Sequence, residues 1–269
     1  MHCARALDPG HVRRRWSPTP WLLLLGSLTG CQVYPGSQAP VTPQRPTFAS
    51  YTTTAAPATM EQETGFSVEP GDRFTTPTTL RYGSGPATEI FLSVSPFNYV
   101  SNPTDPSEIG FGDLDIGVRH RLCDESPATP AWALEASIKL PTAGDTEGLG
   151  TGELDARFAA IQSRVYGEST VTGYYELGLL GNSGSGIDVG FAGSIVGDLP
   201  LDDDVTGFLE LAGILVAEQD RTEIFTTIGV AYRPSPSVVV DGAVTLGVDD
   251  APDLGILFGI TQNIGRPLF

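Results

Sequence analysis

Few residues in this chain have the types and spacing that catalysis or ligand binding requires. The glycine-rich run 148–152 could cradle a phosphate, but it lacks the Lys-Ser/Thr pair of a phosphate-binding loop and a following helix, which favours a hairpin loop. The aspartate run 202–204 could bind calcium, yet it lacks EF-hand spacing and indicates a solvated turn. His120 could assist a hydrolase, but a polar or interfacial histidine is the better interpretation. The sequence therefore indicates that the protein is not an enzyme.

The spacing of cysteines and histidines argues against metal chemistry. Cys3 and Cys31 lie near the N-terminus and Cys123 stands alone, so the chain has neither a CxxC zinc motif nor a framework of paired cysteines. His120 is the one histidine beyond residue 30. We therefore expect no metal and no cofactor.

Charged residues that alternate with apolar ones are the main candidates for a functional surface. In residues 110–122, Asp113, Asp115 and Arg119 share one face of an extended strand, and apolar residues share the other. The candidates for an interior lining are Asp113, Asp115, Arg119, Glu135, Lys139, Glu153, Asp155, Arg157, Glu210 and Asp241. Mixed charges of this kind form either a paired structural network or the selective lining of a pore, and both interpretations remain open. Acids outnumber bases, so a transmitted solute would be neutral or cationic.

The alternating stretches that carry these residues recur from residue 61 to residue 264, separated by turns rich in Gly, Pro, Asp and Ser. Tilted strands of about 9–11 residues cross a bilayer, and a closed barrel pairs every backbone group there. We predict an all-β fold, a transmembrane antiparallel up-and-down β-barrel of about 12 strands. The strands are expected near 61–68, 73–82, 87–97, 110–122, 130–140, 151–163, 169–181, 187–197, 205–217, 222–233, 237–248 and 253–264.

A soluble β-sandwich would alternate as well, and a periplasmic lipoprotein of that fold stays open as an alternative. The barrel is favoured because the stretches are about twice the length of ordinary strands, their number is even, and their outward faces are almost free of charge. An even strand number places both chain ends on one side, which we expect to be periplasmic. The long connections 98–109 and 141–150 would then be extracellular.

The N-terminal residues have the composition of an export signal. Arg13 to Arg15 precede the short apolar stretch 20–30, so residues 1–30 are expected to be a signal peptide. The residues before Cys31 resemble a bacterial lipobox, which would make Cys31 a lipid attachment site. Gln32 follows, and by resemblance to a known sorting rule it favours the outer membrane.

Residues 31–60 are rich in Thr, Pro, Ala and Ser and hold few apolar side chains. Such a segment cannot bury a core, so we expect a disordered tether. A plug inside the barrel is the less favoured alternative. Residues 61–269 would then form the outer-membrane barrel.

The composition excludes some functional classes. The net charge is −17, and phosphate binding requires basic patches, so nucleic acid is not an expected partner. The mean hydropathy is −0.00, and the sequence contains no run of about 20 apolar residues that would cross a membrane as a helix.

Several phrases resemble one bacterial family. They are GFGDLDIGVR (110–119), KLPTAGD (139–145), GTGELD (150–155) and DDAPDL (249–254). The family consists of outer-membrane transporter-like proteins described as components of the meta pathway of phenol degradation, and the resemblance covers about residues 65–264. It implies an outer-membrane barrel that passes small molecules. The stretch 253–260 also resembles the signal that barrel assembly machinery binds, so this machinery and outer-membrane lipid are the expected partners.

Two functions fit these features. The preferred hypothesis is a narrow channel for small neutral or cationic solutes, aromatic compounds among them. The alternative is a closed structural barrel that binds a partner through its loops 98–109 and 141–150.

Overall fold

The computed structural model describes residues 39–101, 106–143, 149–182, 184, 186–249 and 251–265. The expected signal peptide at 1–30 and the lipid attachment site Cys31 lie outside the described residues. No helix within the described part of the chain is long and apolar enough to cross a membrane.

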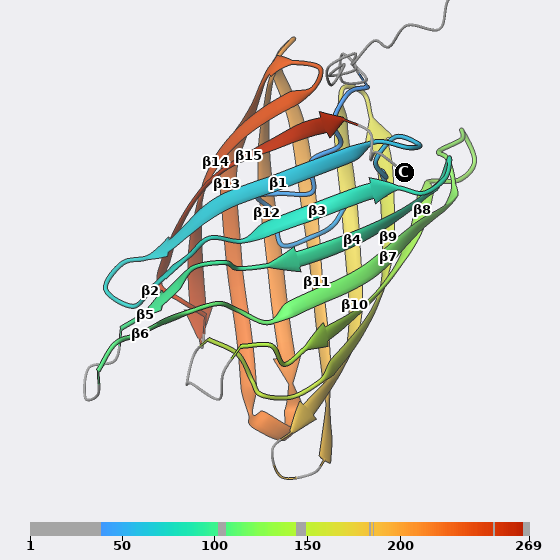
Figure 1. Cartoon of the computed structure of the whole chain (residues 1–269). Coiled ribbons are helices and arrows are strands. Elements are labelled where there is room, and N and C mark those ends of the chain that lie inside the picture. Colours follow the sequence, from blue (N-terminus) through green and yellow to red (C-terminus); the bar gives the residue numbers. More distant parts are fainter. Residues whose placement is uncertain are drawn as a thin grey trace, which may run out of the picture. The chain divides into compact units, whose positions relative to one another are not determined.

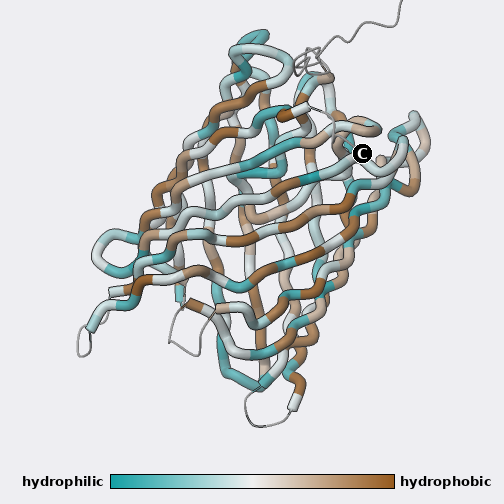
Figure 2. Tube along the Cα trace, viewed as in Figure 1, coloured by the Kyte–Doolittle hydropathy of each residue, from teal (hydrophilic) through white to brown (hydrophobic). Residues whose placement is uncertain are grey.

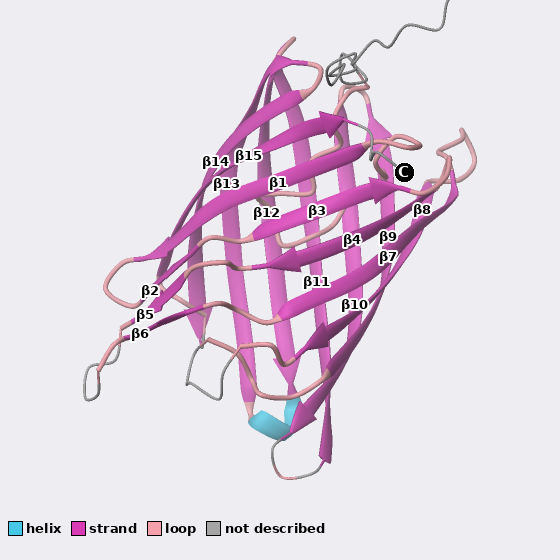
Figure 3. Cartoon of the chain, viewed as in Figure 1, coloured by secondary structure: helices cyan, strands magenta, loops and turns pink. Residues whose placement is uncertain are grey.

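Twelve strands form a closed antiparallel barrel in sequence order, and the last strand pairs with the first (Figures 1 and 3). This confirms the predicted fold class. The strands are β1 (Met60–Glu69), β3 (Thr78–Gly83), β4 (Thr88–Val94), β7 (Leu114–Cys123), β8 (Ala131–Leu140), β9 (Asp155–Tyr166), β10 (Ser169–Asn182), β11 (Gly186–Asp202), β12 (Val205–Val216), β13 (Arg221–Ser235), β14 (Val238–Asp249) and β15 (Leu254–Gly265).

Three adjacent barrel strands, β3, β4 and β7, are each interrupted and have a short strand on the far side of the break. β2 (Arg73–Thr75), β5 (Asn98–Val100) and β6 (Glu108–Gly110) pair with one another and extend one side of the barrel (Figure 1). Pro77, which has no N–H group, separates β2 from β3. A single 3-10 turn, η1 (Ala217–Gln219), joins β12 to β13.

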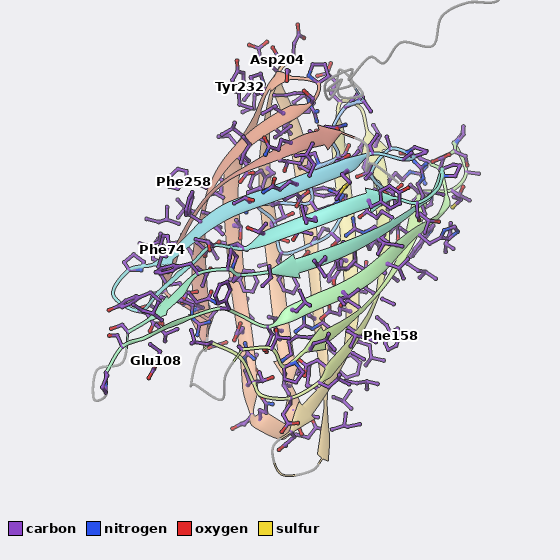
Figure 4. All side chains as sticks on the ribbon, in the orientation of Figure 1. Phe74, Glu108, Phe158, Asp204, Tyr232 and Phe258 are labelled. Atoms are coloured by element: carbon purple, nitrogen blue, oxygen red, sulfur yellow. The ribbon has the colours of Figure 1, made fainter. Side chains whose placement is uncertain are left out.

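The two faces of each strand differ in the way that the alternation predicts. On β12, Leu209, Leu211 and Leu215 point outward and are 56%, 56% and 47% exposed, whereas Phe208 and Glu210 point inward and are 6% and 0% exposed. Figure 2 shows hydrophobic residues recurring along the strands, and Figure 4 shows side chains such as Phe158 and Phe258 on the outside. An apolar surface of this extent is unsuited to water and suits hydrocarbon.

The two ends of the barrel are distinct. Met60 pairs with Gly265, so β1 begins and β15 ends at one rim, which we call the terminal end. The turns 84–87, 124–130, 167–168, 203–204 and 236–237 share this rim. The opposite rim, the loop end, holds the described residues 141–143 and 149–154 between β8 and β9.

Residues 39–59 lie inside the barrel, where Figure 1 shows them in blue behind β1 and β3. Val41, Ala49 and Ala55 of this plug segment are buried, and its backbone bonds to Pro236 at one end and Gly83 at the other. The prediction of a disordered tether over 31–60 is therefore wrong for residues 39–60. The composition argument counted apolar burial alone, whereas this segment is held by hydrogen bonds to the barrel wall. Residues 31–38 lie outside the described residues.

The outward apolar face generates a test of membrane insertion. Leu211 lies in the middle of β12, so Leu211→Arg places a cation in hydrocarbon and should destabilise the folded barrel by about 2–4 kcal/mol. Denaturant titration of the barrel folded into lipid vesicles measures this cost. Leu201→Arg, at the terminal-end rim of β11, is the matched control and should cost about 0–1 kcal/mol. Equal costs at the two positions would argue against a membrane-spanning wall.

Candidate functional site

The interior charges of β1, β3, β4, β7 and β8 form one ion-pair network around two arginines. Arg81 contacts Glu61 at 3.3 Å, Glu63 at 2.6 Å and Glu89 at 3.1 Å, and its side chain is 1% exposed. Glu89 also binds Arg119 at 2.9 Å, and Arg119 binds Glu135. We call these residues the Arg81–Arg119 network: Glu61, Glu63, Arg81, Glu89, Arg119 and Glu135.

Strand register brings the members of this network together. Glu61 lies directly opposite Arg81, Glu89 opposite Arg119, and Arg119 opposite Glu135 on neighbouring strands. Residues of opposite charge that lie opposite each other on neighbouring strands stabilise the pairing of those strands. Removing one partner from a buried group of this kind is costly, because it leaves a charge without compensation.

A second group of ion pairs lies on the same wall toward the loop end. Lys139 contacts Asp155 at 2.8 Å and Asp113 at 3.4 Å, and Arg157 contacts Asp115 at 3.3 Å. Asp113 also accepts the backbone N–H of Ala143 and Thr151, so it holds part of the connection that follows β8.

The opposite wall holds three interior carboxylates that bind the plug segment instead of a wall cation. Glu210 on β12 accepts the backbone N–H of Phe48 at 2.8 Å and of Ala49 at 2.9 Å. Asp241 on β14 pairs with Arg45 at 3.1 Å. Asp198 on β11 accepts the Tyr51 hydroxyl at 3.1 Å. We call Asp198, Glu210 and Asp241 the latch carboxylates.

Partial burial changes the acidity of Tyr51. Burial raises the pKa of the Tyr51 phenol well above its usual value, and the neighbouring Asp198 carboxylate adds to the shift. The phenol therefore remains protonated and donates to Asp198.

The plug segment also contacts the first wall. Thr42 N donates to Glu61 at 3.0 Å, Gln44 N to Glu63 at 2.9 Å and Ala55 N to Glu89 at 2.7 Å. Carboxylates from both walls thus cap the backbone N–H groups of a segment that has no regular secondary structure.

Nine of the ten predicted lining residues form the interior contacts described above. Asp113 directly precedes β7, and the other eight lie on strands: Asp115, Arg119, Glu135, Lys139, Asp155, Arg157, Glu210 and Asp241. Glu153 differs, because β9 begins at Asp155 rather than at the expected residue 151; Glu153 lies in the preceding connection, where its backbone N bonds to Thr151.

The other residues that could do chemistry lie away from this interior. His120 is exposed on the outward face of β7, where its Nδ1 lies 2.8 Å from the Thr88 hydroxyl. Asp202 to Asp204 are exposed at the terminal end, where β11 turns into β12 (Figure 4). Among the described residues, no group of three or more His, Cys, Asp or Glu is arranged to hold a metal ion.

Sequence reasoning missed Glu61, Glu63, Arg81 and Glu89 as site residues. They follow the same alternation as the predicted set, so extending the pattern to the first three strands would have found them. The plug partners could not be found in this way, because their main contribution is backbone N–H groups, which every residue but proline carries.

Two cavities lie along the interior, with plug residues lining both. The loop-end cavity has a volume of about 590 Å³, and the terminal-end cavity has a volume of about 530 Å³. The first has a charged side with Arg119 and Glu135 and an apolar side with Leu180, Ile214 and Val216. A smaller cavity of about 320 Å³ lies where the three strands are interrupted.

The barrel is similar to solved structures of outer-membrane channels. An outer-membrane channel from Pseudomonas putida F1 aligns with a TM-score of 0.63 and 11% identity, over 79% of this chain and 98% of that chain. The KdgM porin in complex with disordered oligogalacturonate aligns with a TM-score of 0.53 and 9% identity, over 75% and 98%. The NanC porin aligns with a TM-score of 0.53 and 7% identity, over 76% and 98%.

At these identities the likeness establishes the fold alone, a β-barrel of the outer-membrane type. No family model and no curated protein matches the sequence. The resemblance to the phenol-degradation family stays a prediction.

The buried network generates a test of its structural weight. Arg81→Met leaves the surrounding glutamates without their shared cation and should destabilise the folded barrel by about 3–5 kcal/mol. Arg121→Met is the control, because Arg121 pairs with Asp124, whose side chain is 79% exposed, and should cost about 0–1 kcal/mol. Denaturant titration in detergent micelles compares the two. A decrease in the free energy of unfolding of less than about 1 kcal/mol for Arg81→Met would show that this network does not stabilise the barrel.

Proposed function

We propose that this protein is an outer-membrane channel for small neutral or cationic solutes, and that the plug segment closes its lumen. One observation carries the proposal: cavities of about 590 and 530 Å³ lie toward the two ends of one barrel, with plug residues between them. A solute that entered at one rim would reach the other if residues 39–59 moved aside. The likeness of the fold to outer-membrane channels supports the same reading.

The charge of the interior supports the solute class. Described acids that face the interior outnumber the bases that face it, which disfavours anions. The acids are Glu61, Glu63, Glu89, Asp113, Asp115, Glu135, Asp155, Glu176, Asp198, Glu210 and Asp241, and the bases that pair with some of them or line the cavities are Arg45, Arg81, Arg119, Lys139, Arg157, Arg221 and Arg233.

The apolar side of the loop-end cavity extends this class to small aromatic compounds. Phe48, Phe91 and Leu257 line this cavity together with Leu180 and Ile214. Apolar lining with a few polar groups is typical of sites for small organic molecules. The resemblance to the phenol-degradation family points the same way.

Transport is a better proposal than catalysis for this interior. Its carboxylates and arginines bind one another or the plug segment, and such pairing is the usual state of buried charges. No step of acid–base or nucleophilic chemistry is needed to account for them.

The fold and the N-terminal sequence support a proposal on localisation and assembly. We propose that the protein lies in the bacterial outer membrane with its terminal end, and so the N-terminus of the barrel, in the periplasm. Export by residues 1–30, lipid attachment at Cys31 and insertion by the barrel assembly machinery complete this proposal.

Replacing the plug segment tests the channel function. A variant in which residues 41–56 become a Gly/Ser sequence of equal length loses the Arg45, Phe48 and Tyr51 contacts, while β1 to β15 remain. In planar bilayers we expect its conductance to exceed that of the full chain by about tenfold or more, with reversal potentials that favour K⁺ over Cl⁻. Heat-modifiable gel mobility checks that the variant is folded. A folded variant without conductance would reject the channel and favour the closed structural barrel.

A further inference from the structure

The plug segment is held in two chemically different ways by the two walls. On the wall of β1 to β8, the carboxylates that accept plug N–H groups also bind Arg81 or Arg119. On the wall of β11 to β14, no Arg or Lys of the described barrel strands pairs with Asp198, Glu210 or Asp241. The latch carboxylates therefore depend on the plug segment for their compensation.

Glu210 is central to this second contact. It is 0% exposed, and each of its two carboxylate oxygens accepts one backbone N–H, from Phe48 and from Ala49. Ser194 and Asp198 of β11 are its polar neighbours on the wall. A protonated carboxyl group keeps one oxygen as a hydroxyl donor, so one of the two plug N–H groups would lose its acceptor.

Asp241 and Asp198 respond to protons in the same direction. Protonation of Asp241 removes the ion pair with Arg45, which is the one charged side chain within residues 39–59. Protonation of Asp198 removes the negative charge of the group that accepts the Tyr51 hydroxyl, and hydrogen bonds to charged acceptors are about twice as strong as neutral ones. Each event therefore weakens a contact that holds the plug segment.

The charged groups around the latch fit this dependence. Glu210 has Asp198 of β11 and the Tyr51 phenol of the plug as electrostatic neighbours, and Asp241 has Arg45 of the plug and Glu63 of β1. Asp198 and Glu210 repel each other with the plug in place, and on this wall the contacts that favour their ionised forms come from Phe48, Ala49 and Tyr51 of the plug segment.

We propose that Asp198, Glu210 and Asp241 form a proton-sensitive latch that holds the plug segment in the lumen when ionised and releases it in acid. The opening of a conducting path rests on the proposed function, whereas the release of the plug does not. Carboxyl groups take up protons as the pH falls toward their ordinary pKa values of about 4, so release of the plug should increase as the pH is lowered.

Plug mobility tests the latch without reference to transport. A spin label on Ser50→Cys, in a Cys123→Ser background, reports plug motion in lipid vesicles, and the same background with Ser50 retained corrects for label elsewhere. We expect an immobile label at pH 7.5 and a mobile one at pH 4.5. Glu210→Gln, which presents a permanent donor to the plug, should raise the mobile fraction at pH 7.5 by about tenfold.

Asp188→Asn is the matched control, because Asp188 of β11 is buried and accepts from Asn182 and Gln219, which lie outside the plug segment. It should leave the label immobile at pH 7.5. A label that stays immobile at pH 4.5, or a Glu210→Gln variant that behaves like Asp188→Asn, would overturn the latch.

Conductance measured on the same samples separates the two proposals. Acid-induced mobility without conductance would sustain the latch and reject the channel. Conductance in the Gly/Ser variant, combined with a full chain that stays immobile and closed at pH 4.5, would sustain the channel and reject the latch.

Discussion

Backbone N–H groups that enter the barrel interior outside a strand must find acceptors there, and this requirement organises the whole interior. The plug segment brings such groups at Thr42, Gln44, Phe48, Ala49 and Ala55. Carboxylates of the barrel wall accept these N–H groups. They are strong acceptors, but their negative charge has to be compensated. Arginines on one wall and the plug itself on the other supply that compensation. The ion pairs of the wall and the hydrogen bonds of the plug segment therefore depend on one another.

The barrel was predictable from the sequence because its constraint is periodic. Side chains alternate between lipid and interior along every strand. The apolar Leu211 is therefore predicted to face lipid, and the charged Glu210 is predicted to face the interior. The same logic identified most of the charged lining, including Asp115 and Lys139. It gave the wrong start for β9, which begins at Asp155 although the alternation extends to the residues before it.

The plug segment was not predictable by the same argument. Its Thr, Pro and Ala residues carry too little apolar surface to fold alone, which is true of the segment in isolation. The interior supplies what the segment lacks, namely acceptors placed by strands far away in the sequence, such as Glu210 opposite Phe48. Interactions of this kind depend on register between distant elements, and neither composition nor local periodicity records them. Arg45 is the one charged residue within 39–59, and a single cation in such a segment was the sequence feature that indicated an ion pair with the barrel wall.

The pairing of β1 with β15 has a consequence for the order of folding. Gln62 and Gln262 meet across this seam although 200 positions separate them, so the wall closes when the first and last strands have both arrived. The plug segment directly precedes β1 and lies on the inner side of the seam. The segment is therefore fully enclosed when this contact between distant parts of the chain has formed, and contacts of such long sequence separation slow folding.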